Sequence, residues 1–298
     1  MVGAKRMKWL LVLVIVCFAM LLFLYSMRKS LPYDFRIIRL GNKLFIHNKE
    51  IWNSRNLDVR YVVNRNKGVV ALDGSSNTAV LPLPDQVVNL KLKITRKDLK
   101  GRLLYRPFLY EGPVPEKKRQ YIVFIGASIG RDWELEQLPE RQPALRETAV
   151  LFWPVFRFDK QEVIDHVLKI PIKPAAVLIK ECAAYFPLNV EQAGKKYLGW
   201  FDELKKNNLE AVAVTTVPVT ISNENQNLGR AESINKFNSF LKSSGEKVFD
   251  LIPILSDPQS GGTFLQESLA QEDGLHLNLK AYRLLDSSLA EFLIVNMP

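Results

Sequence analysis

The sequence is poor in cysteine and histidine. Its 298 residues include two cysteines, Cys17 and Cys182, and three histidines. Cys17 lies within a long apolar run, so we expect no disulfide between the two cysteines. This cysteine content also excludes a zinc site built from two or more thiolates. The chain shows no internal repeat and no low-complexity segment, and with 47% hydrophobic and 24% charged residues its composition is that of a globular protein.

The N-terminus departs from this globular composition. Residues 9–25 are apolar without a break, and Met7 and Met27 extend the run to about the length that crosses a bilayer. The run predicts an uncleaved signal anchor over residues 1–29, with membrane lipid around residues 7–27. Its short N-terminal flank favours a single-pass protein whose bulk lies on the extracytoplasmic side. A cleaved signal peptide is the alternative, but the run is long for one and no small-residue cleavage motif follows it.

Charge is distributed unevenly along the chain. Residues 30–120 carry 18 Lys and Arg against 8 Asp and Glu, whereas residues 121–298 carry 18 against 23. The basic half follows the predicted anchor directly, where anionic headgroups or an anionic envelope polymer would attract it. The alternative is a basic surface that is simply solvated. We expect no nucleic acid partner, because the predicted domain is exported and no nucleic-acid-binding motif is present.

Residues 30–118 are typical of a small β-rich domain. Short β-branched or alternating runs are separated by turns rich in Gly, Asn and Asp, which predicts an antiparallel meander or sandwich. Residues 111–119, rich in proline and charge, are typical of a linker. The predicted strands are residues 43–47, 57–63, 68–72, 78–83 and 87–94.

From Gln120 onward, apolar strands alternate with helical patterns. This alternation predicts a doubly wound, five-stranded parallel α/β sheet over residues 119–298. In such sheets ligands bind at the carboxyl ends of the strands. The predicted strands are residues 121–126, 148–153, 175–180, 210–216 and 246–252, and the clearest helices are residues 161–170, 190–207, 228–243 and 278–295.

A serine follows the first of these strands, at the start of a predicted helix. Gly126 breaks the apolar run, Ser128 comes two residues later, and Asp273 and His276 lie in the loop before the last helix. Serine needs a neighbouring base to become a nucleophile, and histidine suits this role near neutral pH. A carboxylate then orients the imidazole. The amide groups at the helix start would hold a developing oxyanion. A phosphate-binding turn over residues 126–130 is a weaker alternative.

Other residues near the predicted site have simpler interpretations. His47 lies in a predicted strand and His166 in a predicted helix, so we expect both to be structural or surface residues. Trp133 and Tyr185 lie near the carboxyl ends of the strands. They would either stack on a sugar ring or pack in the core.

Taken together, these motifs resemble the SGNH, or GDSL-like, hydrolases over residues 120–298. The resemblance rests on the Gly-Ala-Ser turn that ends at Ser128, on the parallel strand order, and on the Asp-Gly-Leu-His-Leu-Asn block that ends at Asn278. It implies a flavodoxin-like sheet and a serine esterase or acyl-transfer centre without metal or cofactor. Its catalytic residues would be Ser128, Asp273 and His276.

The resemblance is incomplete in two blocks that supply oxyanion donors in the family. Ala127 replaces the usual Asp, residues 152–158 contain no glycine, and residues 180–187 contain no asparagine. We expect Lys180, Arg131 or Tyr185 to substitute as a donor or substrate-binding group. Strand alternation would direct Lys180 and its neighbour Glu181 to opposite sides, so that one of them enters the site.

The sequence thus predicts three parts: an anchor over residues 1–29, a basic β-rich domain over 30–118, and an SGNH-like domain over 119–298. The leading function is a membrane-anchored, exported esterase or O-acyltransferase that acts on acyl esters of an envelope or exported polysaccharide. Hydrolysis and transfer share one acyl-enzyme and are not separated by the sequence. The alternative is an inactive protein of the same fold that binds a glycan or serves in assembly.

Overall fold

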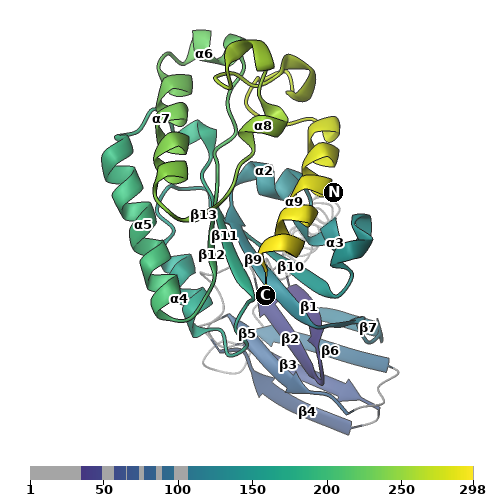
Figure 1. Ribbon diagram of the computed structural model, residues 1–298. Helices are drawn as coiled ribbons and strands as arrows, with labels where there is room; N and C mark the ends of the chain where they lie inside the picture. Colours follow the sequence, from purple (N-terminus) through teal and green to yellow (C-terminus); the bar gives the residue numbers. More distant parts are fainter. Residues whose placement is uncertain are drawn as a thin grey trace, which may run out of the picture.

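The computed structural model describes residues 35–48, 57–64, 66–73, 77–84, 89–96 and 107–297, and Figure 1 shows their arrangement. The predicted anchor over residues 1–29 lies outside these residues and stays a prediction. In the described ranges, no helix is both long and apolar enough to cross a bilayer.

The N-terminal part is a β-sandwich of two four-stranded sheets. One sheet has the strand order β5-β2-β1-β8 and the other β4-β3-β6-β7. Residues on their inner faces, such as Leu44, Val59 and Leu92, form one buried core, because side chains alternate between the faces of each strand. A sandwich is one of the two arrangements that the sequence predicted. The strands are β1 (Phe35–Leu40), β2 (Lys43–Asn48), β3 (Leu57–Val63), β4 (Asn66–Ala71), β5 (Thr78–Pro82), β6 (Asn89–Arg96), β7 (Phe108–Pro113) and β8 (Lys117–Lys118).

The remainder is an α/β unit around a five-stranded sheet in the order β10-β9-β11-β12-β13. Every neighbouring pair is parallel, which confirms the predicted doubly wound sheet. The first strand is buried along nearly its whole length, as expected for a strand covered by helices on both faces. The strands are β9 (Gln120–Gly126), β10 (Thr148–Pro154), β11 (Ala176–Lys180), β12 (Ala211–Val214) and β13 (Lys247–Phe249).

Helices cover both faces of this sheet. Alternate residues of β9 enter two separate cores, with Tyr121 and Val123 in one and Ile122 and Phe124 in the other. The first core is completed by α4 (Gln161–Lys169), α5 (Val190–Lys206) and α7 (Arg230–Ser243). The second is completed by α2 (Ser128–Asp132), α3 (Leu138–Arg141), α8 (Ile252–Leu255) and α9 (Leu279–Asn296). The predicted long helices are confirmed, each to within two residues at either end.

The segment predicted as a linker is part of the fold. Residues 111–119 include the end of β7 and all of β8, which pairs in parallel with β1 through Arg39 and Leu40. Its composition favoured a linker, but backbone pairing does not depend on the side chains. The two parts also share a core, since Phe45 of the sandwich packs on Tyr121 with ring centres 5.4 Å apart.

The carboxyl ends of the five parallel strands meet at one edge of the sheet. Figure 1 shows α2 beginning there after β9, with α6 (Ile221–Gln226) and α8 nearby. The β3 and β4 strands of the sandwich lie at the opposite end of the molecule. The candidate site is therefore positioned by the loops at the far edge of the α/β sheet.

Candidate active site

Ser128 is the first residue of the helix that follows β9. The strand ends at Gly126, Ala127 caps the helix, and α2 begins at Ser128. A Cβ atom added to Gly130 would lie 2.3 Å from the ring of Phe152. Glycine therefore allows α2 to lie directly against β10, and this close packing fixes the direction in which the helix leaves the sheet.

Asp273 and His276 are presented by a tight turn before α9. Gly274 has a φ of +64°, and a Cβ atom there would lie 2.1 Å from Thr220 Oγ1. The Thr220 amide donates to the Gly274 carbonyl at 3.0 Å, and the Asn223 side-chain amide donates to the Asp273 carbonyl at 2.9 Å. These contacts hold the turn to α6, with His276 facing Ser128 and Asp273 behind His276.

The imidazole of His276 bridges the carboxylate and the serine hydroxyl. Its Nδ1 lies 2.5 Å from Asp273 Oδ2, and its Nε2 lies 2.8 Å from Ser128 Oγ. With the proton on Nδ1, the ring donates to Asp273 and accepts from the serine hydroxyl. The order is that of a nucleophile, its base and an orienting carboxylate. The side chain of His276 is 26% exposed and that of Asp273 is 47% exposed, so the arrangement is open to solvent.

The pKa of the Asp273 carboxyl lies below its ordinary value. Partial burial acts to raise this pKa, but hydrogen bonds from the His276 amide, the His276 ring and the Leu275 amide outweigh it. Both amides lie 2.9 Å from Asp273 Oδ1. The carboxylate therefore stays ionised through the neutral range and stabilises an imidazolium at His276.

A buried ion pair lies between the loops that follow β10 and β11. Lys160 Nζ lies 2.7 Å from Glu181 Oε2, and the same ammonium donates to the carbonyls of Arg157 and Phe158 at 3.0 and 3.2 Å. Both strands flank β9, so these two loops flank the turn that carries Ser128. One cation therefore joins the two loops in which the sequence lacks the glycine and asparagine donors of the resembled family. The sequence analysis missed this pair, since nothing in the sequence links residue 160 to residue 181.

Both members of this pair have lost their hydration. The side chains of Lys160 and Glu181 are 0% exposed. Burial raises the pKa of Glu181 to about 7 and lowers the pKa of Lys160, because the charged form of each is penalised in the interior. Within the described part of the chain, Glu181 Oε1 has no hydrogen-bond partner. The ammonium of Lys160 therefore has three acceptors, whereas one of the two carboxylate oxygens of Glu181 stays without compensation from the described residues.

Lys180 does not lie open at the edge of the site. Its side chain is buried, its ammonium donates to the Glu181 carbonyl at 2.8 Å, and burial lowers its pKa to about 8. Glu181 is buried as well, with its carboxylate against Lys160, and the expectation that only one of Lys180 and Glu181 enters the site stays a prediction.

The other two predicted donors lie closer to the surface. Arg131 pairs with Asp132 at 2.7 Å, and its guanidinium carbon lies 5.8 Å from the ring centre of Phe156. Phe156 is 60% exposed. Tyr185 is half-buried, with its hydroxyl 3.4 Å from the Val155 carbonyl. Of the three, Arg131 is the exposed cation on the helix of Ser128.

Trp133 packs in the core, which is one of the two interpretations that the sequence left open. Its indole N–H donates to Asp286 Oδ1 at 2.8 Å, and its ring stacks on Tyr282. Arg141 donates to both oxygens of the same carboxylate, at 2.7 and 2.9 Å. Burial acts to raise the pKa of Asp286, but these hydrogen bonds outweigh it and lower the pKa. This cluster anchors α9, and hence the turn that precedes it, to the segment after α2.

The two remaining histidines serve the structure, as the sequence predicted. His47 is fully buried, and its ring lies 4.5 Å from that of Trp153, edge to face. The ring N–H of His166 donates to the Glu162 carbonyl one turn earlier, at 2.7 Å. Within the described ranges, no group of three His, Cys, Asp or Glu side chains converges as metal ligands would.

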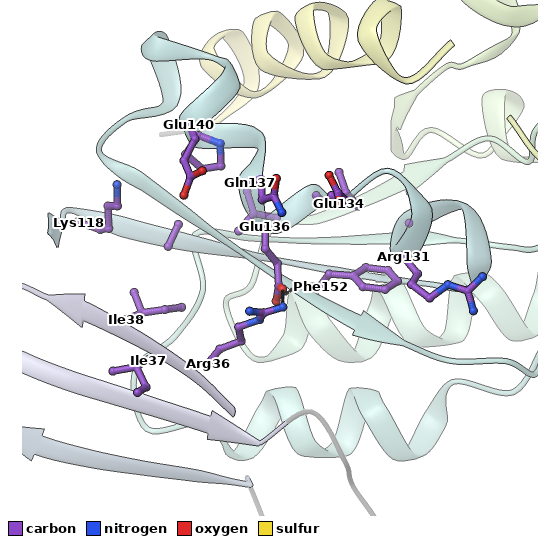
Figure 2. A pocket seen from close by; sticks show the side chains of 15 residues that line it. Arg36, Ile37, Ile38, Lys118, Arg131, Glu134, Glu136, Gln137, Glu140 and Phe152 are labelled. Atoms are coloured by element: carbon purple, nitrogen blue, oxygen red, sulfur yellow. Dashed lines mark hydrogen bonds and ion pairs between the residues drawn. The ribbon is translucent and has the colours of Figure 1, made fainter. Parts of the chain in front are cut away.

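A cavity of about 440 Å³ lies beside α2, between the sandwich and the α/β unit (Figure 2). Arg36 from β1 reaches across it and pairs with Glu136. Glu136 also accepts from the Phe152 amide at 3.3 Å. Arg131 lines the cavity from α2. Side chains of both charges line this space, so it suits a polar occupant next to the candidate site.

Comparison with known proteins gives structural neighbours alone. No family profile matches the chain, and no curated protein matches its sequence. Three solved structures illustrate the similarity: a lipase/acylhydrolase from Enterococcus faecalis (18% identity, 60% of this chain and 97% of that chain, TM-score 0.48); a GDSL-like lipase from Bacteroides thetaiotaomicron (14%, 60% and 89%, 0.45); and a psychrotrophic esterase from a Pseudoalteromonas species (13%, 59% and 97%, 0.43). The neighbours bear the names of the group that the motifs at Ser128 and His276 resemble.

Proposed function

We propose that this protein is a serine esterase or acyltransferase. The observation that carries the proposal is the hydrogen-bonded chain from Ser128 through His276 to Asp273, with 2.8 and 2.5 Å contacts. Its members come from two loops on one edge of a parallel sheet, where such folds bind ligands. The order of atoms is the one that removes a proton from a serine hydroxyl.

The reaction follows from these contacts. Ser128 Oγ attacks the acyl carbonyl carbon while its proton passes to His276 Nε2. The tetrahedral intermediate collapses as His276 returns the proton to the departing alcohol oxygen, which leaves an acyl group on Ser128. Water then releases the acid, or a sugar hydroxyl accepts the acyl group. Asp273 holds the imidazole and offsets its positive charge throughout.

The oxyanion would be held first by the backbone amide of Ser128. The first amides of a helix lack intrahelical acceptors and carry the positive end of its dipole. The glycine and asparagine donors of the resembled family are absent from the two flanking loops. Losing one such donor typically costs on the order of 3 kcal/mol of transition-state stabilisation. Arg131, one turn along the same helix, is our candidate for a compensating donor.

We propose an acylated polysaccharide of the cell envelope or of exported material as the substrate. The exposed Phe156 ring and the adjacent Arg131 would offer an aromatic face and a cation beside Ser128. Such a surface accepts a sugar ring that remains part of a long chain, because the site is open to solvent. The apolar run over residues 7–27 would anchor the protein in the membrane, with its bulk on the extracytoplasmic side.

The test is covalent labelling with a fluorophosphonate probe. The full chain, purified in detergent, should react at Ser128. Ser128→Ala should abolish labelling, and His276→Ala should reduce it strongly. The matched control is Ser287→Ala, which removes an exposed serine on α9 and should label like the parent. Labelling that persists in Ser128→Ala, or that is absent from the parent between pH 6 and 9 (a range set by the need for a neutral imidazole), would contradict the proposal.

A second candidate is a non-catalytic glycan-binding or assembly protein of the same fold. It is favoured by the buried Lys160–Glu181 pair, which occupies the loops where the resembled family has its oxyanion donors. For this candidate, a Ser128→Ala protein should still bind acylated polysaccharide as tightly as the parent, and the parent should release no acid from it.

A further inference from the structure

The outer face of the β4-β3-β6-β7 sheet carries cations among exposed apolar side chains. Residues opposite one another on paired strands point to the same face of a sheet. Arg60 lies opposite Val69 on one side and Lys93 on the other, and Lys93 lies opposite Leu109. Two residues along β3, a second row follows the same pattern. In that row Val62 lies between Lys67 and Lys91.

These residues line one groove of about 610 Å³. Val69 is 63% exposed and Leu109 is 68% exposed, so both present most of their surface to solvent. β3 and β6 bury the alternate residues, such as Val59 and Leu92, in the sandwich core. The outer face is thus a distinct surface, and its apolar groups are not required by the core.

Most of the positive charge on this face is uncompensated. Lys91 pairs with Glu111 across β6 and β7. In the part of the chain that the structure describes, Arg60, Lys67 and Lys93 make no ion pair, and all three are exposed. Cations around exposed apolar groups match a surface that offers both negative charge and hydrocarbon.

We propose that this face docks on a membrane surface rich in anionic lipid. A soluble polyanion would satisfy Arg60, Lys67 and Lys93 but would leave Val69 and Leu109 in water. A bilayer interface receives both kinds of side chain, since long basic side chains reach headgroups while apolar ones enter the region below. The apolar run ends at Tyr25, ten residues before β1 begins at Phe35, so the sandwich is tethered close to any bilayer that holds the run.

Docking in this way would also orient the candidate site. β3 and β4 lie at one end of the molecule, and α2 begins at the edge of the α/β sheet that is farther from them (Figure 1). The loops around Ser128 would then face away from the bilayer, toward material outside it. This inference does not depend on the esterase proposal, because it concerns a different surface.

The test uses the full chain with Cys17→Ser, which leaves the buried Cys182 as the native cysteine. Val69→Cys is labelled with an environment-sensitive fluorophore, and Leu228→Cys, at an exposed position before α7, gives the control label. Each protein is reconstituted in vesicles of phosphatidylcholine alone or mixed with phosphatidylglycerol. Emission at residue 69 should rise at least twofold with the anionic lipid and fall back in high salt. Emission at residue 228 should not change.

Charge reversal separates this face from a general effect of charge. Arg60→Glu, Lys67→Glu and Lys93→Glu together should abolish the rise at residue 69. The matched control reverses three exposed lysines elsewhere (Lys169, Lys206 and Lys280) and should preserve it. Far-UV circular dichroism checks that both triple variants fold.

Three results would overturn the proposal. Emission at residue 69 is the same in both kinds of vesicle, or the triple reversal leaves the rise intact. The third result is that soluble polygalacturonate, without vesicles, raises the emission at residue 69 as much as anionic vesicles do. This result would assign the face to an anionic polymer.

Discussion

Ser128 belongs to an open arrangement of hydrogen bonds, whereas the two loops that flank its turn are joined by a closed ionic one. His276 and Asp273 reach the serine from a turn whose side chains are 26% and 47% exposed. Lys160 and Glu181 join the two flanking loops and are 0% exposed. If the exposed contact between His276 and Asp273 is broken, water can solvate the groups that remain, so the loss of stability is small. If the buried pair is broken, the charge that remains has neither a partner nor water. The comparison predicts that one side governs chemistry and the other governs the shape of the loops.

The largest effect should come from the open side. Ser128→Ala should lower the turnover of an activated ester by about 10⁴-fold or more, because it removes the atom that forms the acyl bond. Its free energy of unfolding should stay within about 0.5 kcal/mol of the parent, since the site is partly exposed. Ester hydrolysis and urea denaturation measure the two quantities. A variant that loses stability as well as activity would break the proposed division.

The closed side should show the opposite balance. Lys160→Met should lower the free energy of unfolding by about 3–5 kcal/mol, because it leaves Glu181 buried without its partner. The double change Lys160→Met with Glu181→Leu should recover most of that loss in urea denaturation. The matched control is Lys196→Met, whose ion pair with Asp159 is exposed and should cost at most about 1 kcal/mol. If the single and double variants were equally unstable, the two side chains would not act as a pair.

A pH experiment sharpens the same contrast. Glu181 has a folded pKa raised to about 7 from an ordinary value of 4.5. Its contribution to stability is therefore fully present below pH 4.5 and is lost as the pH rises through 7, with a slope of up to about 1.4 kcal/mol per pH unit. Glu181→Gln should remove this slope. Asp273→Asn should not change it, because the lowered pKa of Asp273 places its own transition below the ordinary carboxyl range.

The smallest effect concerns the surface beside the site. Phe156→Ala should raise the KM for an acylated oligosaccharide by about two- to fivefold, because an exposed aromatic contact is worth about 0.5–1 kcal/mol. The kcat for a small activated ester should be unchanged. Leu109→Ala, an exposed apolar residue of the sandwich, provides the control. An equal change in KM for both substrates would remove Phe156 from glycan recognition.

Much of the fold could be read from the sequence, because the signals were local. The apolar run of β9 and its break at Gly126 gave the strand and the helix start that carries Ser128. The helical patterns over residues 190–207 and 278–295 gave α5 and α9 to within one residue at either end. Asp273 and His276 lie three residues apart in one short turn, so their contact could be predicted without knowing how distant segments pack.

The contacts that could not be predicted join segments that are far apart in the sequence. β8 pairs with β1 although its residues resembled a linker, and Lys160 meets Glu181 although no pattern in the sequence relates the two. The same holds for Arg141 and Asp286. Local patterns along the chain were enough to place the strands, the serine and its base. Which charges become buried, and with whom, was decided only when the loops met, because the energy of a charge depends on the water and the partners that the fold leaves around it.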